Sequence, residues 1–132
     1  MDSAERLALK KLAMDHRMIK RGHTRCDLCD IRDGIEYHEI VSRGRTEGAP
    51  EEVRDASFQP EICALLCREC HDNVAPTTAG RTLLFGVLIG LYGYENVERM
   101  LNAIPFKYRA NIFLPPKEID LDEPEKKKVR RK

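Results

Sequence analysis

Four cysteines occur as two Cys-x-x-Cys pairs, Cys26 with Cys29 and Cys67 with Cys70, on either side of a long intervening segment. Each pair can bind one ion from a tight turn, and two such pairs have the spacing of a four-thiolate structural zinc site. The ion would join two parts of the chain that are distant in sequence. The spacing therefore predicts a structural Zn²⁺ held by these four thiolates.

The fifth cysteine, Cys63, has no partner at ligand spacing and is interpreted as a small buried residue rather than a reactive thiol. A dithiol redox protein is a poorer interpretation, because each Cys-x-x-Cys pair would have to act alone and neither lies in a thioredoxin-like βαβ pattern. The N-terminal residues do not have the pattern of a secretory signal, so we expect a reducing, cytoplasmic location. In such a compartment paired cysteines are metal ligands rather than disulfides.

The length of 132 residues is typical of one domain, and such a chain buries only about two thirds of its unfolded surface. A metal crosslink would supplement this modest core. The 23 basic and 22 acidic residues nearly cancel, so the overall charge does not identify a partner. The longest apolar run is too short to span a bilayer, and no membrane partner is expected.

The N-terminal segment has the pattern of a helix over about residues 3–20. Asp2 and Ser3 are suitable N-caps, Glu5 suits the positive end of the helix dipole, and Gly22 can end the helix. The apolar side chains that recur at helical spacing, and so predict the buried stripe, are Leu7, Ala8, Leu12 and Ile19. The basic residues that would form a solvated face, or alternatively contact phosphates, are Lys10, Lys11, Arg17, Lys20 and Arg21.

The segment that contains the two cysteine pairs also has the pattern of two short strands. Residues 35–41 have the branched and aromatic content of a strand, and residues 64–66 can pair with them. Between these strands, residues 42–60 are rich in Gly, Pro, Ser and charge and predict a long loop. A short helix is expected to begin at His71 and to end at Pro76.

The order of strand, loop, strand, cysteine turn and helix over roughly residues 25–75 resembles the HNH endonuclease family and its ββα-metal fold. The motifs that carry the resemblance are the first Cys-x-x-Cys pair, His38-Glu39-Ile40-Val41-Ser42-Arg43, and Leu66-Cys67-x-x-Cys70-His71. The resemblance implies an α+β fold whose zinc-stapled core holds a second, catalytic divalent metal between the first strand and the helix.

The family pattern also implies a role for each motif position. When Ile40 and Val41 are set against the family's two aliphatic residues, His38 occupies the metal-ligand position and Glu39 the general-base position. His71 then occupies the position of the helix ligand.

The motif is degenerate at two positions. The family's usual base is His, where this chain has Glu39, and the family's middle Asn corresponds to Ile62. In an alternative register, shifted by one residue, His38 would be the base and Tyr37 the ligand.

Phosphodiester hydrolysis needs a base to deprotonate water and a cation to stabilise the developing charge. The resemblance implies that His38 and His71 hold Mg²⁺, Mn²⁺, Ni²⁺ or Zn²⁺, with Glu39 as the base or as a third ligand. The unperturbed pKa of a Glu side chain, about 4.3, would make Glu39 a weaker base than His at neutral pH. The alternative is that the two histidines are structural, one on a strand face and one at the cysteine turn.

Arginines lie close to these motifs. Arg43 and Arg45 follow the His-Glu strand and are suited to bind a substrate phosphate in a bidentate manner. Arg25 and Arg68 flank the cysteine turns and can do the same. The alternative for all four arginines is ordinary surface charge.

A helix that Thr77 or Thr78 can cap follows the cysteine segment. Its apolar residues cover most of its circumference, which predicts deep burial against the N-terminal helix or in a subunit interface. Gly86 and Gly90 have the small-xxx-small spacing that permits close approach of helices, and they indicate a homodimer through this helix. A second amphipathic helix is expected to end before Pro105.

The predicted organisation is an N-terminal helix (1–22), a zinc-binding HNH-like core (23–76), a C-terminal helical part of the same domain (77–115) and a disordered charged tail (116–132). The expected function is hydrolysis of DNA phosphodiester bonds by an HNH-like metal-dependent endonuclease. The alternative is a catalytically inactive HNH-like zinc protein that binds nucleic acid or a protein partner. Small HNH proteins often occur in phages and other mobile elements, which implies the host cell cytoplasm as the location.

Overall fold

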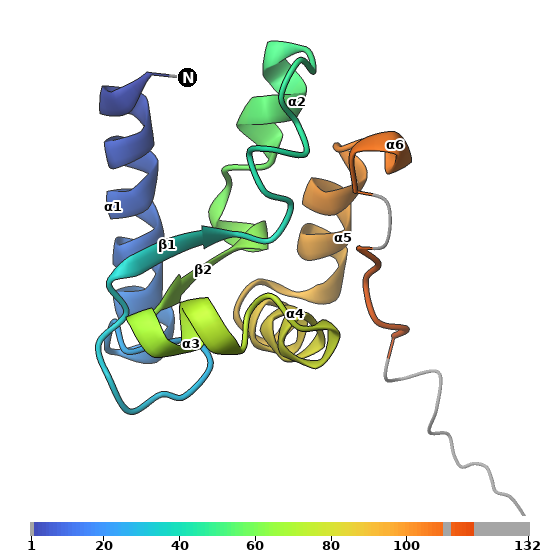
Figure 1. The fold of residues 1–132 in the computed structure, drawn as a ribbon. Coiled ribbons are helices and arrows are strands. Elements are labelled where there is room, and N and C mark those ends of the chain that lie inside the picture. Colours follow the sequence, from blue (N-terminus) through green and yellow to red (C-terminus); the bar gives the residue numbers. More distant parts are fainter. Residues whose placement is uncertain (1, 110–111, 118–132) are drawn as a thin grey trace, which may run out of the picture.

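The structure is a computed structural model that describes residues 2–109 and 112–117. Its elements follow the chain as α1 (Ser3–Arg21), β1 (Glu36–Glu39), α2 (Glu51–Ala56), the 3-10 helix η1 (Pro60–Ile62), β2 (Cys63–Leu66), α3 (Arg68–Asn73), α4 (Thr78–Tyr92), α5 (Tyr94–Asn102) and α6 (Phe106–Arg109) (Figure 1). The predicted mixture of helices with a small two-stranded sheet, an α+β fold, is confirmed. Most of the predicted tail, residues 118–132, lies outside the described residues.

The two strands pair antiparallel, with Glu36 opposite Leu66 and Glu39 opposite Cys63. Successive side chains of a strand point to opposite faces, so His38 and Glu39 project from opposite faces of β1. Glu39 faces α1, where burial raises its pKa and the charge of Arg6 opposes that rise, whereas the ring of His38 lies against His71 of α3. The β1–β2 pair, called the hairpin below, therefore lies between α1 and α3, with α1 behind it in Figure 1.

Helix α1 has the predicted ends but a different buried side. Asp2 and Glu5 form a reciprocal capping box, and Gly22 ends the helix in the left-handed conformation, with φ of 76°. The predicted apolar stripe is wrong: Leu7 and Ile19 are 68% and 79% exposed. The buried residues of α1 are Ala13 and Arg17.

A buried arginine, rather than an apolar stripe, attaches α1 to the rest of the fold. Arg17 is fully buried, and its Nη2 donates to Asp27 Oδ2 at 3.1 Å and to the carbonyl of Cys63 at 2.7 Å. Its Nη1 donates to the Tyr92 hydroxyl. Asp27 also accepts from Arg21 Nη1 at 2.7 Å and from the backbone N–H of Leu65 at 2.9 Å. This Arg17–Asp27 network joins α1, the first cysteine turn, β2 and the end of α4, and it corrects the prediction that Arg17 and Arg21 lie on a solvated face.

The predicted loop over residues 42–60 contains a helix and a 3-10 turn. Pro50 precedes α2, Glu51 and Glu52 occupy its first turn, and Val53 and Ala56 are buried three residues apart. These signals of a helix start are present in the sequence. The prediction missed α2 because the helix has only six residues and the surrounding Gly, Pro and charged residues are typical of a loop. The helix α3 likewise begins three residues before the predicted start, because Cys67 caps it by accepting from the N–H of Cys70.

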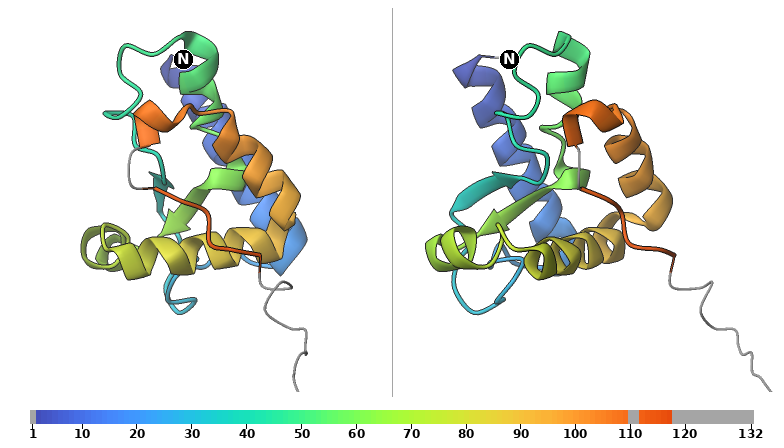
Figure 2. Two further views of the ribbon diagram at one scale, coloured as in Figure 1. Left: turned by 90° about the vertical axis from the view of Figure 1, so that its right-hand side faces the viewer. Right: turned by 45° about the vertical axis from the view of Figure 1, so that its right-hand side comes forward.

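Helices α4 and α5 complete the core. The side chain of Thr77 caps α4 by accepting from the N–H of Gly80, and Leu84, Phe85 and Leu88 are buried against α5 and η1. The burial predicted around most of α4 is therefore only partly correct, since Leu83 is exposed. In both views of Figure 2, α4 runs crosswise to α1. Within the described residues, no helix combines the length and apolar character needed to cross a membrane.

Gly80 lies where α4 passes close to the end of α3. A Cβ at this position would lie 1.9 Å from the carbonyl oxygen of Val74. We expect Gly80→Ala to destabilise the protein by about 1–3 kcal/mol through overpacking. The matched control is Gly86→Ala on the exposed side of the same helix, where the added Cβ meets no atom within 4 Å. Thermal denaturation should show a lower midpoint for the first variant and an unchanged or higher one for the second, since alanine favours a helix interior over glycine.

Candidate metal centre

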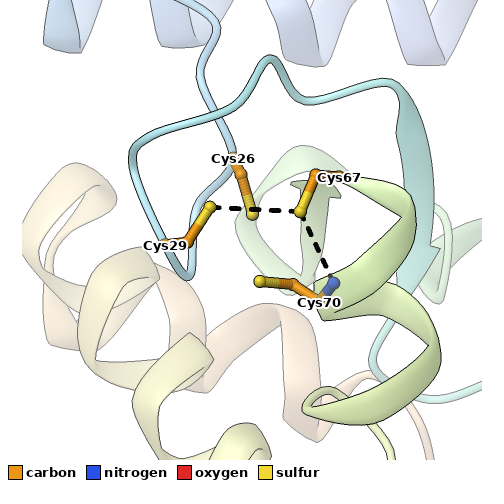
Figure 3. Close-up of side chains that lie close together, drawn as sticks. All are labelled: Cys26, Cys29, Cys67 and Cys70. Atoms are coloured by element: carbon orange, nitrogen blue, oxygen red, sulfur yellow. Dashed lines mark hydrogen bonds between the residues drawn. The ribbon is translucent and has the colours of Figure 1, made fainter.

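The four paired cysteines lie together in space. Their sulfur atoms all lie within 4.8 Å of one another, and Cys29 Sγ is 3.9 Å from Cys67 Sγ. Figure 3 shows the four side chains pointing toward a common space, two from the turn after α1 and two from the start of α3. Zn–S bonds of about 2.3 Å place tetrahedral thiolates roughly 3.8 Å apart, so the arrangement fits one zinc-sized ion. All five cysteines of the chain are free thiols.

Both cysteine turns are shaped by backbone hydrogen bonds, and some of these end on sulfur. The N–H of Leu28 donates to Cys26 Sγ at 3.4 Å, and the N–H of Cys70 donates to Cys67 Sγ at the same distance. In the first turn the N–H of Asp30 donates to the carbonyl of Cys26, and Asp30 adopts φ of 55°, a conformation that Asp tolerates better than most residues. The first pair therefore lies in a turn and the second at the start of α3, and both present their sulfurs to the same space.

The environment of the thiols favours metal ligation. Backbone N–H groups of Arg32 and Ile31 lower the pKa of Cys29 to about 6, and the N–H of Cys70 lowers the pKa of Cys67. Burial raises the pKa of Cys70, and a bound cation would oppose this shift. The group Cys26, Cys29, Cys67 and Cys70 could hold a metal ion and is consistent with structural zinc.

Cys63 lies apart from this group. It is fully buried on β2, its thiol donates to the carbonyl of Ser57, and burial raises its pKa. These features confirm the interpretation of Cys63 as a small buried residue, because the thiolate is the reactive form of cysteine.

The structure brings His38 and His71 together. Their ring centroids lie 5.3 Å apart with an angle of 85° between the rings, one on β1 and one on α3. Metal–nitrogen bonds of about 2.0–2.1 Å give two imidazoles on one tetrahedral ion a centroid separation of roughly 5 Å. The Nδ1 of His71 lies 3.2 Å from Asp72 Oδ1, and because a carboxylate can only accept, Nδ1 is the donor in this contact and Nε2 is the nitrogen that could bind a metal.

Burial, and then the charges of His71 and Arg81, lower the pKa of His38 to about 4. His38 is therefore neutral at physiological pH, which is the form that binds metals. Arg81 was not a candidate from the sequence, because it lies on α4, ten residues after His71. It also lines an open cavity of about 320 Å³ between α4 and the segment 113–116.

Glu39 is not part of the histidine pair. It lines a small cavity on the opposite face of β1, where its Oε1 is buried and has no hydrogen-bond partner. Burial raises the pKa of Glu39, and the charges of Arg43 and Arg6 oppose this shift. In the part of the chain that the structure describes, Glu39 joins neither histidine in a group of three or more metal-ligand atoms.

The positions of Tyr37 and Ile62 bear on the register of the HNH-like motif. Tyr37 shares the face of Glu39, where its ring stacks on Phe58 at 4.7 Å, so it points away from His71. This placement favours His38 over Tyr37 as the partner of His71. Ile62, which the HNH resemblance sets against the family's Asn, is fully buried in the core.

The four predicted phosphate-binding arginines lie in different surroundings. Arg25 and Arg68 form ion pairs with Asp30 and Glu36 at the surface. Arg43 lines the Glu39 cavity, and the backbone N–H of Arg45 donates to the carbonyl of Ser42 in the following turn. Two further arginines that the sequence did not identify, Arg6 and Arg54, line the same cavity as Arg43. They come from α1 and α2 and have no spacing relationship to the motif.

Comparisons of the chain with protein-family models, with curated proteins and with solved structures find no match.

Proposed function

We propose that the protein is an HNH-like, metal-dependent endonuclease that hydrolyses DNA phosphodiester bonds, with Zn²⁺ in the four-cysteine group as a structural ion. The observation that supports this function is the close pair of His38 and His71 beside the cysteine group. The pair joins a strand to the helix that follows the second cysteine turn. A hairpin and a helix with facing ligands are the arrangement that the HNH resemblance implies.

In this proposal the histidine pair holds a second divalent ion, which would stabilise charge on the phosphoryl oxygens and activate a water molecule. His38 contributes a neutral imidazole because burial lowers its pKa to about 4. His71 contributes Nε2, since its Nδ1 faces Asp72. Arg81 adds positive charge beside His38, where a phosphate would bind. Glu39 takes no part in this step because it lies on the other face of β1.

The test is incubation of supercoiled plasmid with Mg²⁺, Mn²⁺, Ni²⁺ or Zn²⁺, followed by gel analysis of the products. We expect cleavage by the wild-type protein with at least one metal, and a loss of roughly 100-fold or more in His38→Ala and in His71→Ala. His23→Ala is the matched control, because His23 lies at the first cysteine turn and contacts Asp30 rather than the pair. Absence of cleavage with every metal, or wild-type rates in both pair variants, would contradict the endonuclease proposal.

A second candidate is a catalytically inactive relative that uses the same scaffold to bind nucleic acid. The observation that favours it is the separation of Glu39 from the histidine pair, together with the burial of Ile62 in the core. Among the described residues, the pair joins no third His, Cys, Asp or Glu in a group of metal-ligand atoms. Retained DNA binding without cleavage would support this candidate.

A further inference from the structure

Three arginines from separate parts of the chain surround Glu39. Arg6 comes from α1, Arg43 from the turn after β1 and Arg54 from α2, and all three line a cavity of about 20 Å³ with Glu39. Ser57 completes the polar lining. This volume is about that of one water molecule. The cavity lies on the face of β1 opposite to His38.

The small cavity adjoins a larger open pocket through two of these arginines. Arg43 and Arg54 also line a pocket of about 350 Å³, together with Gly44 and Glu47. Both arginine side chains are exposed. An anion in the open pocket would therefore meet two guanidinium groups at the mouth and the third, Arg6, deeper in the molecule.

These three arginines differ from most others of the fold in their partners. The arginines whose guanidinium groups form ion pairs with carboxylates are Arg17, Arg21, Arg25, Arg32 and Arg68. Across residues 2–109 and 112–117, the guanidinium groups of Arg6, Arg43 and Arg54 form no ion pair and no hydrogen bond with another side chain. Glu39 is near them, yet its Oε1 is buried without a partner. The donors of this cluster are thus available to an external anion.

We propose that Arg6, Arg43 and Arg54 form a phosphate-binding pocket that takes a backbone phosphate of nucleic acid. The pocket has a net positive charge, because its three guanidinium groups outnumber its two carboxylates. These carboxylates are Glu39 at the floor and Glu47 at the rim. The planar guanidinium fork matches phosphate oxygens in a bidentate manner. Glu39 is a counter-charge at the floor of the pocket. This role explains its buried position among the arginines without any part in the histidine pair.

Nucleic acid as the source of the phosphate rests on the proposed function, whereas the oxyanion pocket itself does not. The histidine pair and the pocket lie on opposite faces of one strand, so each can be altered without the other. Binding measured without added divalent metal depends on the pocket and not on cleavage. Failure of the pocket and failure of the endonuclease proposal are therefore separate results.

The first experiment measures binding of a labelled 20-base-pair DNA duplex by fluorescence anisotropy over a range of NaCl concentrations. We expect Arg43→Ala and Arg54→Ala each to weaken binding by roughly tenfold, the effect of one charge-assisted hydrogen bond. Each should also lower the slope of log Kd against log salt by about one. The matched control is Arg99→Ala, because Arg99 is exposed on α5 and its guanidinium donates to Asn96 instead. Binding by both pocket variants equal to that of the control would overturn the pocket.

The second experiment uses Glu39→Gln, which keeps the shape of the side chain and removes its charge. Anion affinity should rise a few-fold for both the duplex and inorganic pyrophosphate, measured by anisotropy and calorimetry. Weaker binding of both would contradict the role of Glu39 as a counter-charge. Binding of pyrophosphate that depends on Arg43 and Arg54, without binding of the duplex, would overturn nucleic acid as the source of the phosphate.

Discussion

Removal of the metal from the four-cysteine group is expected to unfold the protein. Structural zinc sites supply about 10–16 kcal/mol of apparent binding free energy, and this free energy contributes to folding because the unfolded chain has no preformed site. A domain of ordinary stability has only about 5–15 kcal/mol in total. The wild-type chain should contain one Zn²⁺ by elemental analysis, and excess chelator should abolish the far-ultraviolet circular dichroism of the folded state.

Single substitutions test the same site without a chelator. Cys67→Ser removes one thiolate of the group while serine can still cap α3, so we expect loss of zinc and of cooperative thermal unfolding. Cys63→Ala is the matched control, because this thiol is equally buried but bonds to the carbonyl of Ser57 rather than to the cysteine group. It should retain one equivalent of zinc. A folded, cooperative Cys67→Ser protein without metal would contradict the structural role of the ion.

Arg17→Met is expected to destabilise the protein by about 3–5 kcal/mol, the range for removal of one partner of a buried ion pair. The side chains of Arg17 and Asp27 are both fully buried, and Nη2 of Arg17 is also a donor to the carbonyl of Cys63. Methionine fills much of the volume but satisfies neither acceptor, which leaves Asp27 with Arg21 and the Leu65 N–H as its partners. Chemical denaturation gives the free energy of unfolding directly.

A double-mutant cycle distinguishes the ion pair from simple loss of packing. Asn at position 27 can still accept from the Leu65 N–H, so Arg17→Met combined with Asp27→Asn should destabilise by less than the sum of the single changes. Lys20→Met on the exposed side of α1 is the control and should change stability by no more than about 0.5 kcal/mol. Strict additivity of the two buried changes would show that the pair does not act as a unit.

The parts of the fold that the sequence predicted are those set by local spacing. The two Cys-x-x-Cys turns, the ends of α1 at Asp2 and Gly22, and the cap of α4 at Thr77 each depend on residues within a few positions of one another. The contact between His38 and His71 was also expected, but it came from the family resemblance rather than from spacing.

The features that the sequence did not predict depend on tertiary contacts. Arg17 follows the same helical pattern as its solvated basic neighbours, and its burial is explained only by Asp27, Tyr92 and a backbone carbonyl. The helical period therefore indicated the wrong face of α1, because one buried charge replaced the apolar stripe. The arginines around Glu39 likewise come from three elements that share no sequence motif.

Glu39 illustrates a related difficulty. In the motif it is adjacent to His38, and a linear pattern treats neighbouring positions as parts of one site. The pleat of a strand separates neighbours to opposite faces, and the structure places Glu39 among arginines and His38 against α3. Glu39 therefore lies with Tyr37 on one face of β1, and His38 lies on the other face, where it meets His71.

Asp27 lies between Cys26 and Leu28, so the first cysteine turn and the anchor of α1 share a single backbone segment. We therefore expect binding of an ion by the four cysteines to be thermodynamically linked to docking of α1, and such linkage is reciprocal. Any macromolecule that pulls α1 away from Asp27 would weaken retention of the ion by the same factor by which loss of the ion loosens α1. A probe attached to the exposed side of α1 would therefore report ion occupancy from the far side of the hairpin.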